Sequence, residues 1–96
     1  MPINKKDAPQ LTKEYEQWEK DIVKVAQKEI ENFLQKNSDK MYTILEIENE
    51  IVIPASLATG PNDKHRAVVA VLFVLKMRGK IEKVTTKNGE YNGYIV

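Results

Sequence analysis

The sequence predicts a small α+β domain in which three helices are followed by a two-stranded β-hairpin. Three observations lead to this prediction. Apolar residues between Leu11 and Leu34 recur at steps of three and four, which is helical spacing. Thr43 and Glu46 stand three residues apart, as in a helix capping box. Asn88-Gly89 separates two stretches rich in Thr, Val, Tyr and Ile, which is a strong hairpin signal.

Length and composition agree with one domain and exclude a membrane span. The 96 residues are 42% hydrophobic and 30% charged, which is globular composition. The longest apolar run, Ala67–Leu75, has nine residues, whereas a membrane-spanning helix needs about 20. The chain has no cysteine, and no apolar stretch follows its N-terminal lysines. We therefore expect no membrane partner, no disulfide and a cytoplasmic location.

A long first helix opens the domain. We expect residues 1–10 to be a flexible N-terminus and residues 11–96 to form the single domain, with this helix over residues 11–36. Asp7 is placed to cap the helix, and Pro9 suits its first turn. Twenty-six helical residues are about 39 Å long, which is more than so small a domain covers. The excess stripe is expected either to meet a second chain or to lie across its own domain, and its residues are Leu11, Tyr15 and Trp18.

The capping box places the second helix at residues 43–51. Residues 41–43, just before it, have the composition of a short strand. A loop follows from Val52 to Asn62, because Pro54, Gly60 and Pro61 forbid a continuous helix.

The third helix is predicted at residues 63–78, and the hairpin at residues 80–96. Asn62 or Asp63 can cap the helix, and Gly79 is its expected left-handed stop. In the hairpin, a type I′ turn at Asn88-Gly89 requires positive φ at both residues.

Apolar residues cover the third helix on two opposite sides. At 100° per residue, one side holds Val68, Val71, Leu72 and Leu75, and the other holds Val69, Ala70, Phe73 and Met77. A helix that is apolar all round is normally buried all round. Either only the first turn of this helix touches DNA, or its second side contacts another protein. The predicted homodimer interface consists of Val69, Phe73 and Met77 together with Leu11, Tyr15 and Trp18.

The stretch Ala70–Val84 resembles the junction of recognition helix and wing in winged helix-turn-helix domains. There, too, a helix ends in basic residues and Gly, and an Ile such as Ile81 begins the wing strand. The resemblance covers about residues 22–96 and implies a winged-helix fold that binds double-stranded DNA. The sequence departs from the common pattern in its long loop between the second and third helices and in its apolar third helix.

Two subgroups of the winged-helix class fit these departures. Some plasmid-partition adaptors pack their recognition helices in a dimer interface and present the helix N-termini to DNA. In kleisins, the C-terminal winged helix binds the head of an SMC ATPase and no DNA. Both likenesses imply that the third helix contacts protein.

Charge favours an anionic partner. Residues 1–50 carry eight lysines against eleven acidic residues, a net charge of −3, whereas residues 51–96 carry seven basic against three acidic residues, a net charge of +4. Bases that open the third helix can bind phosphate together with free backbone amides, and a wing can follow a DNA backbone. The predicted DNA-binding residues are Lys64, His65, Arg66, Lys83, Lys87 and Asn88.

Catalysis is not expected. His65 is the only histidine, and its neighbours Lys64 and Arg66 favour contact with an anion over a role as general base. The sequence has no glycine-rich phosphate loop and no cluster with metal-ligand spacing, so no cofactor or metal is expected.

These observations combine into one functional hypothesis with a rival. The sequence predicts a sequence-specific DNA-binding homodimer, either a small transcriptional regulator or a DNA-segregation adaptor associated with the nucleoid. The alternative is a winged helix that binds a protein partner, as a kleisin-like or other complex subunit, and binds no DNA.

Overall fold

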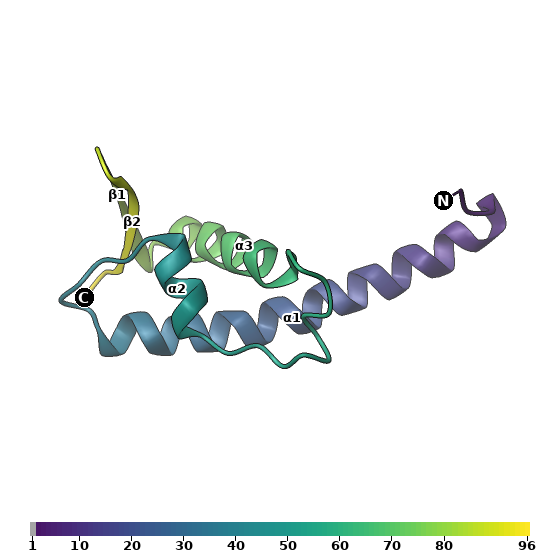
Figure 1. Ribbon diagram of the computed structural model, residues 1–96, viewed down its shortest axis with the longest axis horizontal. Coiled ribbons are helices and arrows are strands. Elements are labelled where there is room, and N and C mark those ends of the chain that lie inside the picture. Colours follow the sequence, from purple (N-terminus) through teal and green to yellow (C-terminus); the bar gives the residue numbers. More distant parts are fainter. Residues whose placement is uncertain (1) are drawn as a thin grey trace.

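The computed structural model describes residues 2–96 and has the predicted α+β architecture (Figure 1). A short 3-10 turn, η1, precedes three helices and one antiparallel hairpin. The elements are η1 (Lys5–Asp7), α1 (Ala8–Lys36), α2 (Ile44–Glu50), α3 (Asp63–Met77), β1 (Ile81–Thr86) and β2 (Gly89–Tyr94). Most bounds lie within one or two residues of the prediction. The exception is α1, which begins at Ala8 rather than at residue 11 because Pro9 is accommodated in its first turn.

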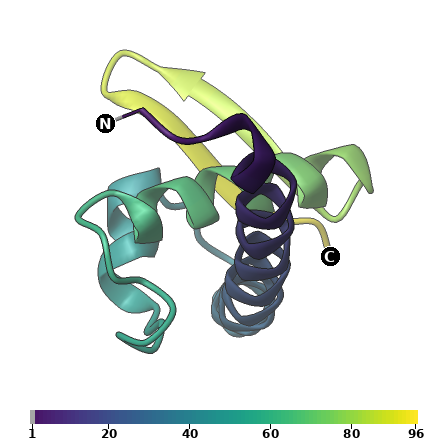
Figure 2. The same cartoon turned by 90° about the vertical axis from the view of Figure 1, so that its right-hand side faces the viewer.

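Helix α1 is longer than the body that it supports. Its 29 residues are about 44 Å long, and the whole molecule measures 50 × 26 × 24 Å. The buried residues of α1 begin only at Ile22. The first part of the helix therefore projects from the body, as Figures 1 and 2 show.

The capping box and the stop at Gly79 are confirmed, whereas two residues found at predicted cap positions make no capping hydrogen bond. Thr43 Oγ1 accepts a hydrogen bond from the Glu46 amide, and the Glu46 carboxylate accepts one from the Thr43 amide, which completes the capping box. Gly79 ends α3 with a φ of 72°. Asp7 and Asn62 occupy the positions before α1 and α3, but neither side chain makes a capping hydrogen bond.

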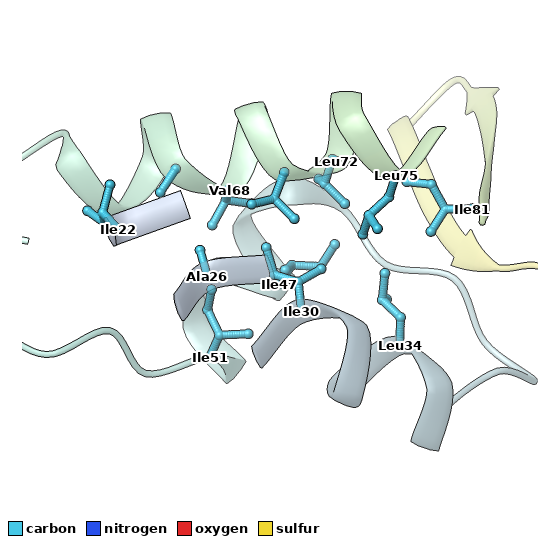
Figure 3. Packing of buried hydrophobic residues seen from close by; sticks show 12 residues of the cluster. Ile22, Ala26, Ile30, Leu34, Ile47, Ile51, Val68, Leu72, Leu75 and Ile81 are labelled. Carbon is cyan, nitrogen blue, oxygen red and sulfur yellow. The ribbon is translucent and has the colours of Figure 1, made fainter. Parts of the chain in front are cut away.

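The core lies where α1, α2 and α3 meet, and it is closed at one end by the first hairpin strand (Figure 3). Helix α1 contributes one residue per turn, and α3 contributes the first of its two predicted apolar sides. The buried apolar residues are Ile22, Ala26, Ile30, Leu34, Ile47, Ile51, Ala67, Val68, Val71, Leu72, Leu75 and Ile81.

The hairpin gains a third element from the segment between α1 and α2. Strand β1 pairs with β2 from Ile81 opposite Tyr94 to Thr86 opposite Gly89. On the other edge of β2, Tyr42 and Asn92 exchange two backbone hydrogen bonds of 2.9 and 2.7 Å. The short strand predicted at residues 41–43 is thus a single bridged residue.

The turn of the hairpin lies one residue earlier in the sequence than predicted. Lys87 and Asn88 are its two central residues, since Thr86 pairs with Gly89. No residue other than glycine among residues 2–96 has positive φ, so the predicted type I′ turn at Asn88-Gly89 is wrong. The Thr86 hydroxyl accepts from the Asn88 amide and donates to the Gly89 carbonyl, and this local pairing holds the turn with ordinary φ at Asn88.

Candidate interaction surfaces

The outward side of α3 is an exposed apolar face, which we call the α3 face and define as Val69, Ala70, Phe73 and Met77. Val69 is 42% exposed, Phe73 65% and Met77 72%, and Ala70 is also exposed. These side chains recur at every turn of the helix, directly opposite the side that fills the core. The sequence predicted two apolar sides, and in the single chain only one of them is covered.

The surface around the α3 face is hollowed. A shallow apolar hollow lies along it, bordered by His65, Arg66 and Val74. A second hollow of about 180 Å³ opens where α1 crosses α3, between Trp18 and Ala70. Exposed apolar surface beside hollows of this kind is typical of a protein contact site.

Positive charge borders the α3 face. After Asp63, helix α3 has no acidic residue, and two of its cations, Arg66 and Lys76, border the α3 face. Arg66 lies beside Val69 and Phe73 at one end of the face, and Lys76 lies beside them at the other. A partner with apolar residues flanked by carboxylates would match this surface.

The first turn of α3 brings three predicted DNA-binding residues together but turns them in different directions. At 100° per residue, Lys64 lies about 20° from buried Leu75 and is only half-exposed. His65 pairs through Nδ1 with the carboxylate of Glu48 on α2. Arg66 alone points to the outward side. The three side chains therefore do not form one cationic patch.

The other predicted DNA-binding residues lie on the hairpin, which follows the C-terminal end of α3, opposite to its first turn (Figure 1). Lys83 forms an ion pair of 3.2 Å with Glu90 on the neighbouring strand. Lys87 and Asn88 form the exposed tip. The structure thus separates the predicted DNA-binding residues into two groups, one at each end of α3.

The predicted interface residues of α1 also fall into two sets. Trp18 is half-buried against its own chain, where its indole Nε1 donates a hydrogen bond of 2.7 Å to the Leu57 carbonyl. Leu11 and Tyr15 remain exposed on the projecting part of the helix. A hydrogen bond with Glu19 and the negative charge of its carboxylate raise the pKa of Tyr15.

Sequence reasoning missed Asn92 on β2. This side chain is fully buried, its Nδ2 reaches the Tyr42 carbonyl at 3.4 Å, and its Oδ1 has no hydrogen-bond partner among the described residues. Asn92 borders a hollow of about 130 Å³ together with Phe73, Lys76 and Lys83. Strand alternation is the signal that could have indicated the burial of Asn92, because it puts Asn92 on the same side of β2 as half-buried Tyr94.

Two further features bear on the classes of function considered. No helix within residues 2–96 has the length and apolar character needed to cross a membrane. Across the same residues, His, Asp and Glu side chains form no group of three that could hold a metal ion. Comparisons with protein-family models, curated proteins and solved structures find no match for this chain.

Proposed function

We propose that the chain is a winged-helix domain. The order of its elements supports this assignment: a helix, a bridged residue at Tyr42, two helices and a hairpin. The arrangement of Tyr42 on the free edge of β2 supports it further, because the segment between the first two helices then joins the wing. The length of the loop between α2 and α3, residues 51–62, is a departure that the proposal includes.

We propose that this domain acts by self-association through the α3 face. One observation carries the proposal, which is the exposure of Val69, Phe73 and Met77 on one side of a helix whose other side is core. Complete burial of a large apolar side chain contributes about 1.5–3 kcal/mol. A second copy would bury the same three side chains again, so a symmetric contact doubles the gain.

The composition of the α3 face argues against its use for reading DNA bases. Base edges in the major groove are distinguished mainly by hydrogen-bond donors and acceptors. The side chains of Val69, Phe73 and Met77 contain no conventional hydrogen-bond donor, and their only acceptor is the weakly accepting sulfur of Met77. Burial in a protein contact uses these side chains fully, whereas the major groove would use only their contact with thymine methyl groups.

Sedimentation equilibrium or light scattering at micromolar concentration tests self-association. Two chains of 11.0 kDa are expected to form one particle of twice that mass. Phe73→Glu buries a charge in the contact and should give monomers with unchanged circular dichroism. Leu45→Glu is the matched control, since Leu45 is 67% exposed on α2 outside the α3 face, and it should leave the dimer intact. A monomeric wild-type chain over this concentration range contradicts the proposal.

A second function, binding of double-stranded DNA, is favoured by a different observation. Among the ion pairs of residues 2–96, none involves Lys76, Arg78 or Lys87, which lie at the end of α3 and on the hairpin. Cations without acidic partners remain available to phosphates. In this proposal, a dimeric regulator or segregation adaptor would contact the DNA backbone with its hairpin.

Salt dependence of binding tests the DNA proposal. Fluorescence anisotropy with a mixed-sequence duplex should give a log–log slope of about −0.9 for each phosphate contacted. Arg78→Ala and Lys87→Ala should each flatten that slope by about one and weaken binding to all sequences alike. Lys24→Ala is the control, because Lys24 is exposed on α1, outside α3 and the hairpin. Absence of binding at low salt contradicts this function and leaves self-association standing.

A further inference from the structure

The projecting part of α1 has an apolar edge that its own chain covers only in part. We call residues 8–17 the α1 arm, and none of them is buried. Leu11 is 43% exposed and Tyr15 is 53% exposed, and they lie one turn apart on the same side of the helix. Only Tyr15 approaches the body, at the hollow that it shares with Arg66 on the first turn of α3.

The charge of the α1 arm is opposite to that of the α3 face. Lys13 is the only cation of the arm, against Glu14 and Glu16. At 100° per residue, these two carboxylates lie on either side of the edge formed by Leu11 and Tyr15. The arm is therefore an apolar edge flanked by negative charge, and the α3 face is an apolar face flanked by Arg66 and Lys76.

The arm cannot cover the α3 face of its own chain. Helix α1 is continuous from Ala8 to Lys36, so a return of the arm over α3 would require the helix to break. Trp18 also holds the base of the arm to the loop at Leu57. At 100° per residue, Leu11 and Tyr15 continue the side of α1 that carries buried Ile22, but Leu11 lies on the part of the helix that projects beyond the body, where a second molecule can reach it.

We propose that the α1 arm of one copy docks on the α3 face of a second copy, and that the second arm docks reciprocally on the first. This inference rests on the proposed self-association and names the segment that makes the contact. Stable interfaces bury about 800 Å² on each partner. Three exposed side chains on one helix supply only part of that area, and reciprocal docking adds the arm to the contact on both chains.

The first experiment measures the dimer dissociation constant of arm variants. Leu11→Ala combined with Tyr15→Ala removes the apolar edge and keeps good helix formers in an exposed helix. We expect at least a tenfold rise of the dissociation constant. Gln17→Ala changes the opposite side of the same arm, where Gln17 bonds only to Asp21, and should leave the constant unchanged.

Charge reversal tests the same contact in a second way. Glu14→Lys combined with Glu16→Lys should weaken the dimer, because both lysines would then face Arg66 and Lys76 of the other copy. Adding Arg66→Glu and Lys76→Glu to the same chain should restore it. Restoration requires that the two pairs of residues meet, so a merely local effect on helix stability would not produce it.

Cysteine cross-linking identifies the contact directly, because the natural chain contains no cysteine. A mixture of Leu11→Cys and Phe73→Cys chains should oxidise to a disulfide between the two variants. If instead Phe73→Cys alone forms a disulfide-linked dimer and the arm variants dimerise as tightly as wild type, the α3 faces meet each other and the arm proposal is wrong. Self-association would stand in that case, whereas a monomeric wild-type chain would overturn both.

Discussion

The indole nitrogen of Trp18 and the carbonyl oxygen of Leu57 lie 2.7 Å apart, in a hydrogen bond that joins α1 to the loop between α2 and α3. This contact marks the position at which α1 leaves the body. It also restrains a loop that has no helix or strand and whose turns lie at residues 55–57 and 61–62. One side chain thereby sets both the base of the α1 arm and the course of the long loop.

Trp18→Phe should lower the free energy of unfolding by about 1 kcal/mol. Phenylalanine keeps most of the ring packing but cannot donate to the Leu57 carbonyl, and a typical hydrogen bond contributes about 0.5–1.5 kcal/mol. Urea unfolding monitored by circular dichroism measures the difference. Leu45→Ala, at an exposed residue outside the proposed contact, is the control and should leave the unfolding midpoint nearly unchanged. Equal midpoints for Trp18→Phe and wild type would show that the bond contributes nothing.

The capping box at the start of α2 predicts coupled effects of two substitutions. Thr43→Ala should cost about 1 kcal/mol, because it leaves the Glu46 amide without its acceptor. Glu46→Ala should cost less, since an exposed Thr43 amide can bond to water. Thermal unfolding of both single variants and the double variant gives the coupling energy. Strict additivity would mean that the two hydrogen bonds are independent.

Asn92→Leu should leave the protein as stable as wild type or make it more stable. The buried Oδ1 lacks a partner among the described residues, and an unsatisfied buried polar group costs about 1–3 kcal/mol. The hollow beside Asn92, bordered by Ile44 and Leu72, can take the larger apolar side chain. Asn92→Ala, which removes the amide without filling the space, should be less stable than Asn92→Leu. A loss of more than about 1 kcal/mol for Asn92→Leu in urea unfolding would assign the amide a positive role.

Features that depend on local sequence were predictable. The apolar spacing of α1, the Thr43 capping box and the stop at Gly79 each involve residues a few positions apart, and the structure contains all three. The two apolar sides of α3 also followed from spacing alone. For the candidate site, this periodicity is sufficient to identify the residues of the α3 face.

Features that depend on distant contacts were not predictable. Glu48 is 17 residues from His65, and nothing in the sequence connects the two before α2 packs on α3. The contact between Trp18 and Leu57, 39 residues apart, likewise needs the finished fold. The direction of Lys64 toward the core side follows from its helical angle, although three consecutive basic residues at 64–66 favour the prediction of one shared surface.

The turn of the hairpin gives a prediction that separates two backbone geometries. Gly89 has a φ of 125°, and no side-chain or backbone atom outside its neighbours lies within 4 Å of the position a Cβ would take. Gly89→Val is therefore opposed by backbone conformation and not by crowding. A β-branched residue held at positive φ costs about 1–3 kcal/mol. For a domain of this size, each kcal/mol lowers the melting temperature by about 4–8 °C.

Asn88→Val is the matched comparison for Gly89→Val, because it puts the same side chain at the adjacent residue. Asn88 has no positive φ, and its exposed side chain takes no part in the hydrogen bonds of Thr86. We therefore expect Gly89→Val to lower the melting temperature clearly and Asn88→Val to change it by no more than about 2–4 °C, as for surface substitutions. If instead a type I′ turn were centred on Asn88-Gly89, both residues would need positive φ, and both variants would be destabilised to a similar extent. Calorimetry of the two variants thus decides whether Lys87-Asn88 or Asn88-Gly89 forms the centre of the turn.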